Sequence, residues 1–74
     1  MKLTPIQIQK LEEHLSSYFN EPIEFHTIDE HPNKEVKDVM IWYKTNHPNA
    51  LYQYIIAHLT VGVNNDLVVE KLWR

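Results

Sequence analysis

Two consecutive β-like runs with apolar side chains on both faces constrain the fold of this chain most. In the first run Val39, Ile41 and Tyr43 alternate with Met40 and Trp42. The second run covers residues 51–61, and its two alternating sets are Leu51, Ile55, Ala57, Leu59 and Val61 on one side and Tyr52, Tyr54, Ile56 and His58 on the other. One helix covers only one side of a sheet, so the other side is expected to meet a partner.

The chain opens with a strong helix signal. Thr4 is a natural N-cap, Pro5 suits the first helical position, and Gln7 completes a capping box. Apolar residues then recur at helical spacing, namely Ile8, Leu11, Leu15 and Phe19. Glu12 is expected to point to water, and Asn20 can end the helix in a left-handed conformation. The stripe is narrow, so the helix is expected to lie on one surface as a lid.

Three further segments predict strands joined by turns. After Pro22, the residues Ile23, Phe25 and Thr27 are expected on one face, and Glu24, His26 and Ile28 on the other. The tripeptides at 31–33 and 47–49 are both His-Pro-Asn, which is turn chemistry used twice. Asn64 and Asn65 tolerate positive φ and predict a hairpin before a strand at 67–74. The alternative for that last segment is a short helix capped by Asp66.

These elements predict an α+β fold in which an N-terminal helix packs on an antiparallel four-stranded meander, in the order α-β-β-β-β. Residues 1–74 form one small domain, which is marginally stable alone. The expected core joins the helix to the inward set of the strands, which is Ile23, Phe25, Val39, Ile41, Tyr43, Ile55, Ala57, Leu59 and Val61.

The opposite set predicts an interface. Its members are apolar or aromatic where the open face of an antiparallel sheet is normally polar. A contiguous surface of this composition is typical of the centre of a protein–protein contact. The predicted interface residues are Met40, Trp42, Tyr52, Tyr54, Ile56, His58 and Trp73.

Charge is unevenly distributed along the chain, whose net charge is −3. Eight acids and four lysines fall in residues 1–38, whereas residues 39–74 hold two acids and three bases. No cationic cluster exists for phosphate binding, so a nucleic-acid partner is not expected. The first five residues do not resemble a signal peptide, and no apolar run is long enough for a membrane span. A candidate acidic surface comprises Glu21, Glu24, Asp29, Glu30, Glu35 and Asp38.

Catalytic and metal chemistry find little support. The five histidines are scattered over different elements, so no metal site and no cofactor are predicted. A grouping of Asp29, Glu30, His31 and Asp38 is explained more simply as a solvated turn. Cysteine is absent, only one glycine is present, and no hydroxyl residue has an evident neighbouring base. His58 is a conceivable acid–base residue, but a packing role is the commoner one. The chain is therefore expected not to be an enzyme.

The favoured interpretation is a small cytoplasmic interaction module, a homodimer or a binder of another protein through its aromatic sheet face. Cysteine-free composition suits a reducing compartment. Two alternatives stay open: a small-ligand-binding domain with an aromatic pocket, and an acidic inhibitor or immunity-type protein.

Overall fold

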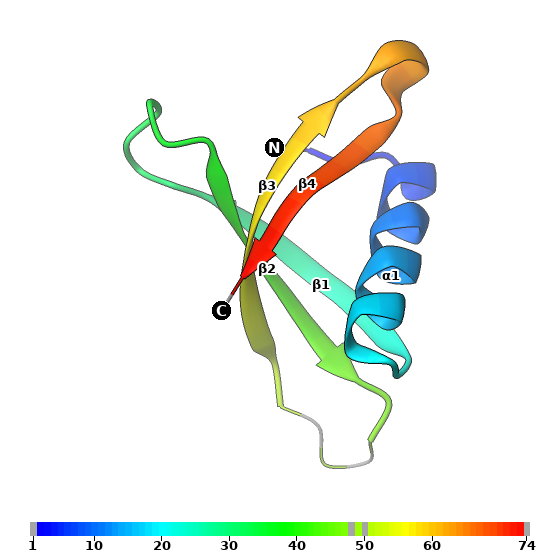
Figure 1. The fold of residues 1–74 in the computed structure, drawn as a ribbon. Helices are drawn as coiled ribbons and strands as arrows, with labels where there is room; N and C mark the ends of the chain where they lie inside the picture. The colour runs from blue at the N-terminus through cyan, green and yellow to red at the C-terminus, as the bar shows by residue number, and fades with distance from the viewer. Residues whose placement is uncertain (1, 48, 50, 74) are drawn as a thin grey trace.

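The computed structural model describes residues 2–47, 49 and 51–73. Helix α1 (Pro5–Phe19) is followed by strands β1 (Ile23–Glu30), β2 (Asp38–Thr45), β3 (Gln53–Val61) and β4 (Leu67–Trp73), with a 3-10 turn (Val63–Asn65) before β4. All neighbouring strands are antiparallel, and their order in the sheet is β1-β2-β3-β4. Figure 1 shows α1 on one side of the strongly twisted sheet. The predicted α+β meander is confirmed, including a strand at the C-terminal segment.

The helix begins and ends where its capping residues predict. The Thr4 hydroxyl accepts the Gln7 backbone N–H at 3.2 Å, and the Gln7 amide oxygen accepts the Thr4 N–H at 2.9 Å. Asn20 closes the helix with a φ of 56°, and its N–H binds the Ser16 carbonyl. These contacts satisfy backbone groups that the helix itself leaves unpaired.

The core lies between α1 and the inner face of the sheet. Leu11 and Leu15 from α1 are fully buried against inward side chains of the strands, which include Ile23, Val39, Ile41, Tyr43, Ile55, Ala57, Leu59 and Leu67. Val61 was expected in this core, but 51% of it is exposed because it ends β3, next to the turn. Leu51 lies before β3 and is also exposed.

Gln7 has a second role that its capping position does not reveal. It is buried, and its side-chain N–H donates to the Asn65 carbonyl at 2.8 Å. Lys10 pairs with Asp66 at 3.6 Å in the same region. The first two turns of α1 are therefore tied to the β3–β4 turn, which lies beside them in Figure 1. In that turn Asn64 and Asn65 have φ values of 61° and 60°, as the sequence predicts.

Strand β1 departs from the predicted alternation. Phe25 pairs with Tyr43 but Thr27 pairs with Trp42, so His26 is the extra residue of a β-bulge. The bulge reverses the facing of every later residue: Thr27 is exposed, while Ile28 packs partly buried against the core. The expected assignment of Thr27 to the inner face and Ile28 to the outer face is wrong for this reason.

The connection between β1 and β2 is a turn stabilised by its own side chains. The His31 imidazole accepts the Asn33 N–H, and the Asn33 amide oxygen accepts the Glu35 N–H, both at 3.0 Å. The first His-Pro-Asn tripeptide therefore acts in a turn, as predicted. The second includes Pro48, which lies outside the described residues, as does Arg74 of the predicted last element.

Candidate interaction face

The structure brings the seven predicted interface residues together on the sheet face opposite α1. The ladder pairs Met40 with Ile56, Ile56 with Trp73, and Trp42 with Tyr54. Alternate residues of β2 and β3 are buried core side chains, so Met40, Trp42, Tyr54, Ile56 and His58 point outward. Tyr52 lies just before β3, and Trp73 joins the set through its pairing with Ile56. We call this set the aromatic face; it consists of Met40, Trp42, Tyr52, Tyr54, Ile56, His58 and Trp73.

Side chains of the aromatic face pack on one another. The rings of Trp42 and Tyr54 lie with centroids 5.2 Å apart, within the range of favourable aromatic pairs. Tyr52 and Tyr54 remain 50% and 49% exposed, and the other five members are partly buried. Within the described residues, no element covers this face. Large aromatic area is thus held in fixed positions and left accessible.

Two residues of this surface were not among the seven that the sequence predicts. His26 stacks on Tyr52 with ring centroids 4.1 Å apart, reaching over β2 from the bulge in β1. Lys44 lies 5.6 Å from the Tyr52 ring centroid and 3.6 Å from a Glu24 carboxylate oxygen. Alternation gives both residues an outward facing, but the contact of His26 with Tyr52 depends on the tertiary arrangement of β1, β2 and β3.

Both edges of the sheet are protected against strand addition. On β1, the Ile23 N–H donates to the Ser16 hydroxyl at 3.1 Å, and the Phe25 N–H donates to a Glu12 carboxylate oxygen at 2.8 Å. Glu12, expected in water, is therefore an edge cap. On β4 a second bulge lies at Glu70, between Val69 and Lys71. Bulges, charges and covered donors all discourage edge-to-edge pairing. The open face, rather than an edge, is the unprotected surface.

The six candidate acidic residues do not form one surface. Glu21 lies before β1 and approaches His47 at 3.8 Å, whereas Glu30 and Glu35 lie at and beyond the other end of that strand. A strand of eight residues separates the two groups by roughly 25 Å. Asp29 and Asp38 flank the aromatic face, and Glu24 pairs with Lys44. Most of these carboxylates have specific local partners.

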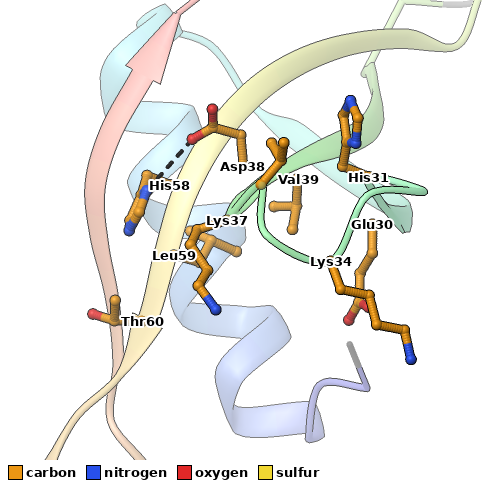
Figure 2. Close-up of a pocket in the computed structure, with 10 residues that line it drawn as sticks. Glu30, His31, Lys34, Lys37, Asp38, Val39, His58, Leu59 and Thr60 are labelled. Carbon is orange, nitrogen blue, oxygen red and sulfur yellow. Dashed lines mark ion pairs between the residues drawn. The ribbon is translucent and has the colours of Figure 1, made fainter.

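His58 joins three strands through two carboxylates. Its Nδ1 lies 3.4 Å from Asp38 in β2, and its Nε2 lies 3.1 Å from Glu70 in β4. Figure 2 shows the Asp38 contact at the side of an open hollow of about 480 Å³. Residues of the loop between β1 and β2 and residues 58–60 of β3 line this hollow. Lys34 and Lys37 extend from that loop. The two carboxylates bind opposite ring nitrogens, so the cluster cross-links strands and does not converge on one point.

The histidine and carboxylate side chains of the described part of the chain are dispersed. Across residues 2–47, 49 and 51–73, no group of three or more histidine or carboxylate side chains is placed to hold a metal ion. Thr60, the hydroxyl beside the hollow, donates to a Glu70 carboxylate oxygen at 3.5 Å. A neighbouring hollow is lined by Asp29, Glu30, His31 and Asp38, but these side chains are not placed to hold a metal ion together.

A second hollow of about 520 Å³ opens beside the first, at one end of the aromatic face. Met40, Ile56 and Trp73 supply apolar walls, and Asp29 and Asp38 stand among the other lining residues. A third hollow lies against Trp42, Tyr52 and Tyr54. The aromatic face is therefore uneven, with raised rings separated by shallow depressions.

Comparison with protein families, curated proteins and solved structures finds no match for this chain. Within the described residues, no helix combines the length and apolar character that crossing a bilayer requires.

Proposed function

We propose that this protein is a non-enzymatic interaction module that self-associates through its aromatic face. The observation that carries the proposal is the contrast between the two sides of β2 and β3. One side is packed beneath α1, whereas the other presents tryptophan, tyrosine, isoleucine and methionine with no described helix or strand over it. Surfaces of this composition are characteristic of interface centres.

An interface of ordinary size would cover a modest share of the surface of this chain. A specific interface buries about 800 Å² on each partner, which is roughly 15% of the 5458 Å² accessible surface of the chain. The aromatic face with its flanking residues extends over all four strands of a molecule measuring 36 × 27 × 18 Å. Covering it would also offset the marginal stability of a domain this small. The cysteine-free composition supports a cytoplasmic setting for such a dimer.

A small-ligand site is the second candidate. It is favoured by the hollow of about 520 Å³ with apolar walls from Met40, Ile56 and Trp73. Ligand sites of this volume are common, but they usually enclose most of the ligand. This hollow is broadly open, so self-association remains the stronger proposal. An acidic inhibitor or immunity-type role is less favoured, because the six candidate acidic residues are dispersed and offer no single binding surface.

Tyr54→Glu tests the proposal with a matched control. Tyr54 is 49% exposed on the aromatic face, and Tyr18 is 54% exposed on α1. A buried unpaired carboxylate is costly in an interface, so Tyr54→Glu is expected to weaken the dimer by about a hundredfold. Tyr18→Glu is expected to leave it unchanged. Sedimentation equilibrium measures both.

Equal dimer affinity for the Tyr54 variant and the wild-type protein would contradict the proposal. Quenching of tryptophan fluorescence by small apolar compounds, saturable in a strictly monomeric wild-type protein, would favour the ligand-binding alternative instead.

A further inference from the structure

One cross-strand row of the aromatic face runs over all four strands and differs in charge at its two ends. The ladder places Asp29 beside Met40, Met40 beside Ile56, and Ile56 beside Trp73. The Lys71 ammonium lies 5.0 Å from the centroid of the Trp73 ring. The row therefore begins with a carboxylate on edge strand β1 and ends with a cation over an indole on edge strand β4.

The two terminal charges are not neutralised within this row. Asp29 accepts the indole N–H of Trp42 at 2.9 Å, which is a neutral donor. Lys71 makes no ion pair within the described ranges, and its ammonium rests against the ring of Trp73. Asp29 on β1 and Lys71 on β4 lie three inter-strand spacings of about 4.8 Å apart, so they are too distant to pair within one chain.

We propose that the occupant of the aromatic face is a second copy of this chain, docked face to face about a two-fold axis that runs parallel to β2 and β3 and passes between Met40 and Ile56. This inference rests on the proposed function and specifies its geometry. The axis sets Met40 against Ile56 of the second copy. It also sets Asp29 against the second copy's Lys71, once at each side of the dimer.

Charge selects this axis over one that runs perpendicular to the strands. An axis perpendicular to the strands sets β1 against β1 and β4 against β4, so that Asp29 meets Asp29 and Lys71 meets Lys71. Like charges brought together across an interface disfavour that arrangement. The parallel axis makes the row self-complementary, with an apolar centre and an opposite-charge pair at each end.

Charge reversal distinguishes the two axes. Each single variant, Asp29→Lys or Lys71→Glu, creates two like-charge contacts about the parallel axis and is expected to weaken the dimer about tenfold at low salt. The double variant Asp29→Lys/Lys71→Glu restores both opposite-charge contacts and is expected to return to within about threefold of wild-type affinity. Sedimentation equilibrium gives the affinities. Lys2→Glu, in the exposed segment before α1, makes the same change in net charge as Lys71→Glu and is expected to leave the dimer affinity unchanged.

The outcomes separate this inference from the proposed function. Rescue in the double variant supports the parallel axis and shows that a chain with both substitutions still folds. A wild-type dimer whose affinity is unchanged by both single variants overturns the axis while leaving self-association standing. Single losses that add in the double variant also overturn the opposition of Asp29 and Lys71. A wild-type protein that stays monomeric overturns the proposed function itself.

Discussion

The two faces of the sheet are made by the same strands and both carry apolar side chains, yet they have different environments. On the inner face, Ile41 and Ile55 lie beneath α1 and are fully buried. On the outer face, their neighbours Trp42 and Tyr54 contact each other and remain accessible. The comparison shows that alternation alone identifies two apolar faces, and the single helix can cover only one of them.

The inner face also holds the contacts that fix the arrangement of the elements. Gln7 and Lys10 connect α1 to the β3–β4 turn, and Glu12 and Ser16 connect it to the edge of β1. Comparable links on the outer face are within the sheet, as in the His58 contacts with Asp38 and Glu70. One face thus determines the fold of the monomer, and the other is the face that we propose for association.

Substitution of adjacent isoleucines gives the largest expected difference between the faces. Ile55 is fully buried, and Ile55→Ala is expected to lower the free energy of unfolding by about 2–5 kcal/mol. Ile56, the next residue on β3, belongs to the aromatic face. Ile56→Ala is expected to cost less than about 1.5 kcal/mol in dilute monomer and more as protein concentration rises, because dimerisation adds burial.

Urea unfolding of both isoleucine variants at two protein concentrations measures these changes. A loss for Ile56→Ala equal to that of Ile55→Ala in dilute solution would break the comparison, since it would mean that the outer position is already part of the monomer core.

A smaller effect is expected where the helix protects the edge of β1. Glu12→Ala removes the carboxylate that accepts the Phe25 N–H and is expected to destabilise the protein by about 1 kcal/mol. Glu13 is exposed on the same helix, so Glu13→Ala serves as the control. Amide hydrogen exchange provides a local measurement: the Phe25 amide is expected to exchange faster in the Glu12 variant. Unchanged exchange at Phe25 would contradict the role of Glu12 as an edge cap.

Much of this architecture follows from local sequence signals. Thr4 with Gln7 defines the helix start, and the positive φ values of Asn20, Asn64 and Asn65 fall at residues that tolerate them. Period-two alternation identified the strands and placed Met40, Trp42, Tyr54, Ile56 and His58 on one face. Trp73 joins them because the bulge at Glu70 shifts β4 by one residue. These signals are reliable because each depends on residues close in sequence.

The features that could not be predicted depend on tertiary pairing. The bulge at His26 arises from the register of β1 on β2, and it exchanged the expected positions of Thr27 and Ile28. Glu12 and Gln7 have partners 13 and 58 residues away in the sequence. Helical periodicity and capping rules concern only near neighbours, so they could not predict these two contacts. Val61 fits the inward alternation of β3, but its position at the end of the strand leaves it exposed.

Light scattering coupled to size exclusion, over about a hundredfold range of protein concentration, tests the central claim most directly. The account predicts a mass that rises with concentration toward twice the 8.9 kDa of the single chain. The Tyr54→Glu variant is expected to stay near 8.9 kDa throughout that range. A wild-type protein that remains monomeric at every concentration would contradict self-association through the aromatic face.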